Sequence, residues 1–137
     1  NFVIVQTDDQ SALINSLKEN KLIKNKEINK NLPFNFADGI GVDTPEMEAL
    51  ELSKNYADYG ICVSHEECFL EAKKLNSDIK YSNNEEIFSG GTSVAVYLAL
   101  KKLKDENFIK LSDVIVILSC EGNIDDIVIE YIKNLSN

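Results

Sequence analysis

Short apolar runs alternate along the chain with segments in which hydrophobic residues recur at helical spacing. Residues 114–118 form one such run, mostly β-branched, which ends in Ser119 and Cys120 before a helical pattern over residues 124–135. An unbroken apolar run closed by small and polar residues predicts a central strand that is buried on both faces. Ligands in open α/β sheets bind beyond the carboxyl ends of such strands, so Ser119 and Cys120 are candidate site residues.

The other apolar segments extend this alternation over the rest of the chain. Strands are predicted at residues 2–6 and 60–63, and a glycine-containing extended segment at residues 36–42. Helix starts are predicted from three capping signals: Asp8 or Asp9, the turn at residues 43–46, and the box formed by Ser64 and Glu67.

A fourth helix is predicted after the run SGGTS, which begins with Ser89 and Gly90. This helix reaches about Leu103 and is apolar nearly all round, which is typical of a buried helix. Strands and helices at this spacing predict a three-layer α/β fold, a mostly parallel sheet with helices on both faces. We expect a single domain over residues 1–137.

The composition narrows the classes of partner. The chain has 137 residues and a net charge of -9, which disfavours nucleic acid and membrane surfaces as partners. All 14 basic residues are lysines, so the bidentate arginine grip on carboxylates and phosphates is absent from this chain. An anion would be held by backbone N–H groups, hydroxyls or lysine.

The cysteines and the histidine do not predict a metal site. The three cysteines are widely spaced without a C-x-x-C pair, and His65 is the only histidine. We therefore expect reduced thiols in a cytoplasmic protein, no metal, and an exposed His65 in the capping-box turn. No apolar stretch approaches the roughly 20 residues that span a bilayer.

Two turns are candidate sites, each with a simpler interpretation. Ser89–Ser93 lies at a predicted helix N-terminus, a position that favours an anion, but the run matches no phosphate-loop pattern. The same small residues are also expected where a tight turn leads into a buried helix. The position of Cys120 after a strand suggests a thiolate nucleophile. Enzymes with such a thiolate bind their anionic substrate in a loop that needs an arginine, and this chain has none. Ser119 lacks a G-x-S-x-G context, so we expect it to contact a ligand's polar atom rather than to attack. The acidic pairs are interpreted as helix caps.

Several segments, in order, resemble the C-terminal part of the fold-type II pyridoxal-phosphate enzymes, the threonine synthase and threonine/serine dehydratase superfamily with the tryptophan synthase β-like fold. NFVIVQTDD resembles the strand after the family's glycine-rich phosphate loop, and FADGIGVDTPE the ADGI-V-x-x-P stretch. ICVSHEECFLEAKKL resembles the V-S-x-x-E-x-x-x-A helix, and IFSGGTSVAVYLALKKL the E-P-S-G-A-x-x-x-A segment. VIVILSCEGNID resembles both V-V-L-T-G-x-G-x-K-D of threonine synthases and V-V-S-G-G-N-I-D of dehydratases.

The resemblance implies pyridoxal 5'-phosphate as cofactor, an amino acid as substrate, and a lyase or transferase reaction such as elimination or replacement. It implies that a side chain after the last strand contacts the cofactor's pyridine nitrogen. Ser119 takes that position in the threonine synthase alignment, and Cys120 takes it in the dehydratase alignment. Ser89 and Gly90 would lie near the active-site wall, although Phe88 replaces the family's proline.

The family's Schiff-base lysine, its asparagine and its phosphate loop would all precede residue 1, so no catalytic residue is expected in this chain. The chain begins inside a strand pattern without an initiator Met, and we expect a C-terminal fragment that is inactive alone. The intact enzyme is expected to be a homodimer or a subunit of a heteromeric enzyme.

Two alternatives come from other functional classes. One is a non-catalytic α/β small-ligand-binding or regulatory domain, which would bind a small anion or amino acid at the turns over residues 89–93 or 119–123. The other is a dimerisation or partner-docking domain.

Overall fold

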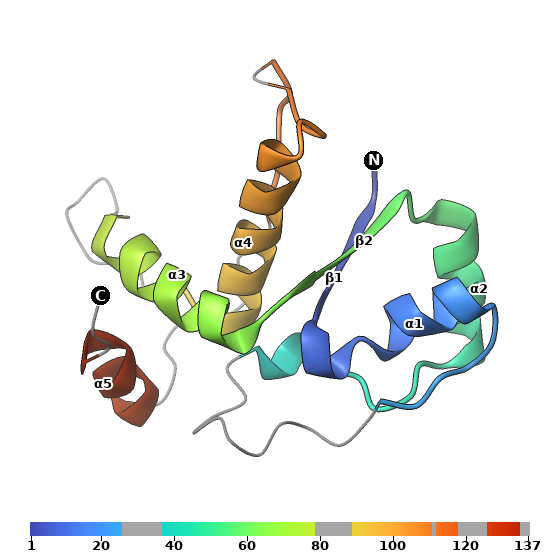
Figure 1. Ribbon diagram of the computed structural model, residues 1–137, viewed down its shortest axis with the longest axis horizontal. Coiled ribbons are helices and arrows are strands. Elements are labelled where there is room, and N and C mark those ends of the chain that lie inside the picture. Colours follow the sequence, from blue (N-terminus) through green and yellow to red (C-terminus); the bar gives the residue numbers. More distant parts are fainter. Residues whose placement is uncertain (26–36, 79–88, 111, 118–125, 135–137) are drawn as a thin grey trace.

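The computed structural model describes residues 1–25, 37–78, 89–110, 112–117 and 126–134. These residues form a mixed α/β structure in which a small parallel sheet packs against helices (Figure 1). Strands β1 (Val3–Thr7) and β2 (Tyr59–Val63) pair with Val3 opposite Tyr59 and Thr7 opposite Val63. Both strands therefore end at the same edge of the sheet.

Seven helical elements accompany the two strands in the described part of the chain. They are η1 (Asp8–Gln10), α1 (Ala12–Glu19), η2 (Asp38–Ile40), α2 (Met47–Tyr56), α3 (His65–Asp78), α4 (Gly91–Asp105) and α5 (Asp126–Asn134). The strands predicted at residues 2–6 and 60–63 are confirmed, as are the helix starts before residue 47, at the capping box and after Gly90. None of the described helices is long and apolar enough to cross a membrane.

The two faces of the sheet contact different helices. Successive side chains of a strand point to opposite faces, so Gln6 shares one face with Gly60. This face meets α1, because the Ile14 amide donates to Gln6 Oε1 at 2.9 Å and the Ile14 side chain lies over Gly60. The opposite face, with Val63, packs against α3 and α4, so helices flank the small sheet on both faces (Figure 1).

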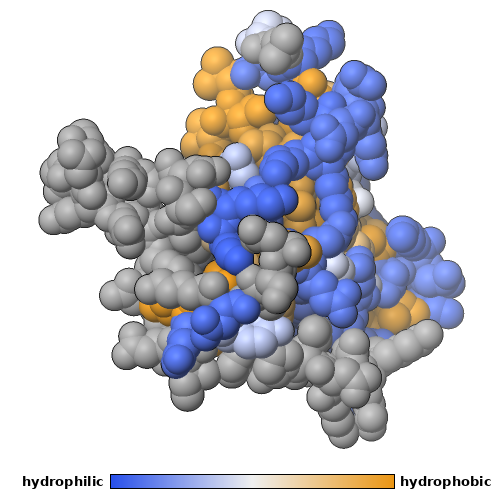
Figure 2. All heavy atoms as spheres, turned by 60° about the vertical axis from the view of Figure 1, so that its left-hand side comes forward, coloured by the Kyte–Doolittle hydropathy of each residue, from blue (hydrophilic) through white to orange (hydrophobic). Residues whose placement is uncertain are grey.

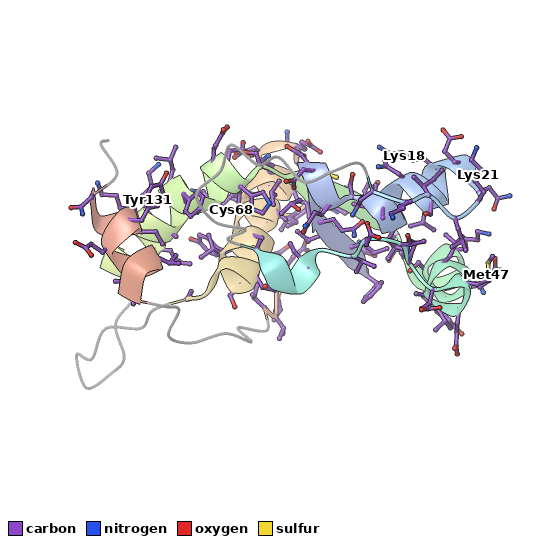
Figure 3. The ribbon with its side chains drawn as sticks, turned by 90° about the horizontal axis from the view of Figure 1, so that it is seen from below. Lys18, Lys21, Met47, Cys68 and Tyr131 are labelled. Carbon is purple, nitrogen blue, oxygen red and sulfur yellow. The ribbon has the colours of Figure 1, made fainter. Side chains whose placement is uncertain are left out.

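The largest apolar core lies between α3, α4 and α5. Cys68, inside α3, is fully buried and lies between the helices, whereas Met47 lies at the outer end of the molecule (Figure 3). Phe69 of α3 meets Tyr131 of α5 edge to face, with ring centroids 5.1 Å apart. Lys101 Nζ binds Glu71 Oε2 at 2.8 Å and thereby adds a polar link between α4 and α3.

The predicted central strand at residues 114–118 is wrong for the residues that are described, 114–117, which belong to neither strand. Val114 is 93% exposed and Val116 83% exposed, so the run is not buried. A strand is stabilised by hydrogen bonds and side chains of neighbouring strands, and within the described residues only β1 and β2 pair. Leu118, Ser119 and Cys120 lie outside the described residues.

Two local predictions near α1 are also wrong. Neither Asp8 nor Asp9 caps α1, because residues 8–10 form η1 and Ser11 occupies the N-cap position. The extended segment predicted at residues 36–42 contains the 3-10 turn η2, although Val42 does form an isolated parallel bridge with Ser11. Residue 36 lies outside the described residues.

Candidate functional site

The carboxyl edge of the sheet is where most elements of the molecule meet. β1 continues into η1, β2 continues into α3, and both η2 and the first turn of α4 lie beside this edge (Figure 1). Loops at the carboxyl edge of a parallel sheet are the usual position of a binding site in α/β proteins. This edge is therefore the candidate site.

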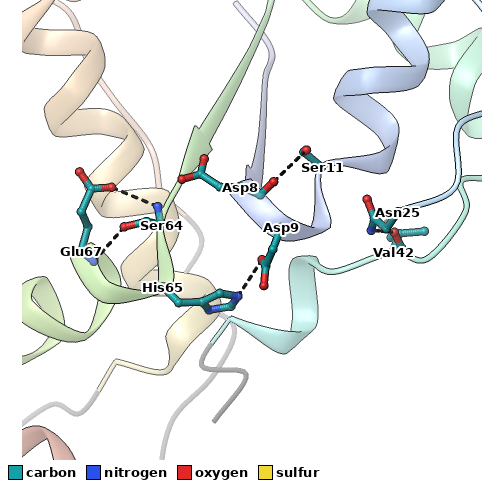
Figure 4. A network of polar contacts seen from close by, with 8 residues as sticks. All are labelled: Asp8, Asp9, Ser11, Asn25, Val42, Ser64, His65 and Glu67. Carbon is teal, nitrogen blue, oxygen red and sulfur yellow. Dashed lines mark hydrogen bonds and ion pairs between the residues drawn. The ribbon is translucent and has the colours of Figure 1, made fainter. Parts of the chain in front are cut away.

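The start of α3 is fixed by the predicted capping box. The Glu67 amide donates to Ser64 Oγ at 3.1 Å, and the Ser64 amide donates to Glu67 Oε2 at 3.0 Å (Figure 4). Lys102 Nζ reaches the same carboxylate oxygen at 2.7 Å. The hydrogen bond from Lys102 and the backbone bond from Ser64 lower the pKa of Glu67 below its ordinary value of 4.5.

His65 is buried, so the prediction of an exposed histidine is wrong. It is 4% exposed, and its Nε2 lies 3.1 Å from Asp9 Oδ1 across the edge of the sheet (Figure 4). Asp9 is thus the partner of a histidine rather than a helix cap. The sequence gives no local signal for this contact, because the two residues are 56 positions apart and lie in polar turns.

Three buried polar atoms at this edge find no hydrogen-bond partner among the described residues: Thr7 Oγ1, Asp9 Oδ2 and His65 Nδ1. Nearly all buried polar atoms in proteins are paired, so three together mark an unusual place. The tautomer of the His65 ring decides which of its two nitrogens donates and which accepts, and the Thr7 hydroxyl can do either.

The two predicted residues that are described, Ser89 and Gly90, lie at the start of α4. Both are buried, and Gly90 is the N-cap residue and makes no side-chain cap bond. Because α4 contacts both strands and η2, the structure brings Ser89 and Gly90 toward the same end of the sheet as Asp9 and His65. The other predicted residues, Ser119 and Cys120, are not among the described ones.

The described residues match only part of what a pyridoxal-phosphate site needs. The lysines between Lys18 and Lys110 that the structure describes are exposed or half-buried, so none of these is an enclosed amine that could bind the cofactor. The buried turn at Ser89 and Gly90 fits one wall of such a site. These residues therefore support no reaction step through the cofactor.

Metal and thiol chemistry gain no support from the described residues. No group of three or more His, Cys, Asp or Glu side chains in the described ranges could hold a metal ion. Cys62 and Cys68 are free thiols. Burial raises the pKa of Cys62, and raises that of Cys68 to about 12, so neither is an activated thiolate.

A comparison with known protein families finds none that matches the chain, and a comparison with curated proteins finds no relative.

Proposed function

We propose that the chain is the C-terminal part of a pyridoxal-phosphate-dependent enzyme that acts on amino acids, with the fold-type II architecture. The parent would be a cytoplasmic lyase or transferase, with a three-layer and mostly parallel sheet. The arginine-free composition, rich in lysine and asparagine, suggests one specific candidate, the β subunit of 2-amino-4-oxopentanoate thiolase. The parent would be a homodimer or part of a heteromeric enzyme, and this chain alone would be inactive.

One observation carries the proposal. Ser89 and Gly90, which the resemblance assigns to the cofactor-site wall, are buried and begin α4 beside the carboxyl ends of two parallel strands. That end of the sheet is where such folds bind ligands. The exposed apolar residues Val114 and Val116 also fit a chain whose natural structure covers them with further residues.

The proposed roles of this chain's residues are limited to holding and orienting the cofactor. When bound, pyridoxal phosphate stabilises negative charge on the substrate's α-carbon. Ser119, or in the second alignment Cys120, would contact the pyridine nitrogen without an aspartate, which leaves the ring a weaker electron sink. The lysine that attaches the cofactor would lie outside this chain.

The test is cofactor binding by the protein expressed together with its upstream coding sequence and any partner subunit. We expect a visible absorption band from bound pyridoxal phosphate. The matched variants Ser119→Ala and Cys120→Ala separate the two alignments, because only the one that removes the pyridine contact should weaken binding or shift the band. Absence of any band with cofactor supplied would contradict the proposal.

A second candidate is a non-catalytic domain that binds a small ligand. The observation that favours it is the set of unpartnered buried atoms on Thr7, Asp9 and His65, all of which belong to this chain. The upstream coding sequence distinguishes the two candidates. A glycine-rich phosphate loop and a lysine region upstream would support the enzyme, and their absence would support the binding domain.

A further inference from the structure

Strand β2 leaves one edge of the sheet open. A strand that pairs on one side only directs half of its N–H and C=O groups away from its partner. β2 pairs with β1, and no other backbone hydrogen bond between described residues involves Tyr59–Val63. Gly60 is exposed and has no side chain, so its exposed surface is main chain that a further strand can reach.

This edge lacks the protection that edge strands normally have. Natural proteins block such edges with charged residues, proline, bulges or covering elements. β2 has the sequence YGICV, without charge or proline, and its register with β1 runs residue by residue without a bulge. Only Val63 of its five residues is buried, whereas three of the five residues of β1 are buried. β2 is therefore the strand of this sheet that is open to a further strand.

The chain also contains a strand-forming segment that has no strand partner. Residues 114–117 have the sequence VIVI, and β-branched residues of this kind favour strands. Their exposure alternates as it does along an extended chain, with Val114 93% and Val116 83% exposed against 44% for Ile115. No backbone hydrogen bond between described residues involves residues 114–117.

A turn holds this segment away from the sheet of its own chain. The Asp113 amide donates to the Lys110 carbonyl at 3.0 Å, and the Lys110 amide donates to Asp113 Oδ2 at 2.9 Å. The chain thus turns just before Val114, beyond the end of α4 (Figure 1). Val114 and Val116 face solvent there, so a second molecule can reach them.

We propose that residues 114–117 of one copy of this chain pair with the open edge of β2 in a second copy and add a third strand to its sheet. Pairing gives each of the two backbones the partner that it lacks. Both stretches are uncharged, so the contact brings no like charges together in a chain of net charge -9. Because every copy carries both stretches, reciprocal pairing closes a two-fold dimer. The inference needs no cofactor and is independent of the enzyme proposal.

The test is amide hydrogen exchange of the full ¹⁵N-labelled chain at low and at high protein concentration. We expect amides in β2 and in residues 114–117 to exchange about tenfold or more slowly at high concentration, because pairing between copies protects them. Equal protection at both concentrations would place the pairing within one chain and overturn the proposal. Association without protection of β2 would place the contact elsewhere and overturn it as well.

Proline substitutions separate backbone pairing from simple apolar contact. Adjacent N–H groups of a strand point to opposite edges, so Ile115→Pro/Val116→Pro removes one that faces β2 in any register. This variant should stay monomeric in sedimentation. The matched variant Ile115→Leu/Val116→Leu keeps both N–H groups and should associate as the natural chain does. A proline variant that associates as strongly as the natural chain contradicts the proposal.

Discussion

At the residue scale, the molecule contains buried hydroxyls of two kinds. Ser16 is fully satisfied, since its Oγ donates to the Ala12 carbonyl at 2.6 Å and accepts from the Ile23 amide at 2.8 Å. Thr7 Oγ1 is equally buried and has no hydrogen-bond partner in the part of the chain that the structure describes. A buried polar group without a partner forfeits its hydration, which costs roughly 1–3 kcal/mol.

This contrast gives a matched pair of substitutions. Thr7→Val removes an unpaired hydroxyl at constant shape and should raise the free energy of unfolding by about 1 kcal/mol. Ser16→Ala removes a paired hydroxyl and leaves the Ile23 amide without its partner, so it should lower that free energy by about 1 kcal/mol. Denaturant unfolding of both variants measures the difference, and destabilisation by Thr7→Val would show that its hydroxyl has a partner in solution.

At the element scale, α2 shows how little of a short helix needs to be buried. Leu50 is 1% exposed, while Leu52 on the same helix is 52% exposed. Leu50→Ala should therefore lower the free energy of unfolding by about 2–5 kcal/mol, and Leu52→Ala by less than about 0.5 kcal/mol. Equal effects of the two variants in denaturant melts would mean that Leu50 is not buried in the folded chain.

The capping box of α3 makes a pH-dependent contribution to stability. The pKa of Glu67 is lowered in the folded chain, so its contribution is complete above the unfolded value and is lost as the pH falls through the folded value. The side chain is 45% exposed, which limits this contribution to less than about 1 kcal/mol.

Glu67→Gln tests this directly. The variant should be less stable than the natural chain at neutral pH, and the difference should shrink as the pH falls below 4.5 and vanish once the pH is below the lowered pKa of Glu67 in the folded chain. Thermal melts across this pH range measure the difference. A stability difference between the variant and the natural chain that persists in acid would mean that the shape of the Glu67 side chain, and not its charge, causes the effect.

Elements with a complete local signal could be predicted from the sequence. β2 and α3 follow from a short apolar run and from the capping box of Ser64 and Glu67, which are three positions apart in the chain. The run at residues 114–118 has the composition of a strand, but pairing depends on neighbours that no local pattern specifies. The burial of His65 likewise depends on Asp9, a partner 56 positions away, so that part of the site could not be predicted.

At the scale of the whole molecule, apolar surface is exposed in the segment that follows α4. The consecutive residues Val114, Ile115 and Val116 are all exposed. Figure 2 shows hydrophobic residues on the surface in the upper part of the molecule. Contiguous exposed apolar residues favour association, whereas the net charge of -9 opposes it.

We expect the isolated chain to self-associate through this segment. Sedimentation at several concentrations should show a weight-average mass that rises with concentration. The double variant Val114→Lys/Val116→Lys should stay monomeric, while Met47→Lys/Leu52→Lys, which changes charge equally on exposed residues of α2, should behave as the natural chain. Identical behaviour of the two double variants would exclude the segment as the contact.

The central claim, that this chain forms one side of a pyridoxal-phosphate site whose lysine lies elsewhere, is tested most directly by locating the cofactor. The protein expressed with its upstream sequence is incubated with pyridoxal phosphate, reduced with borohydride and digested, and the modified lysine is identified by mass spectrometry. We predict a single modified lysine outside the 137 residues of this chain. The claim would be contradicted if one of the 14 lysines of this chain were modified. It would also be contradicted if no lysine of the longer protein were modified.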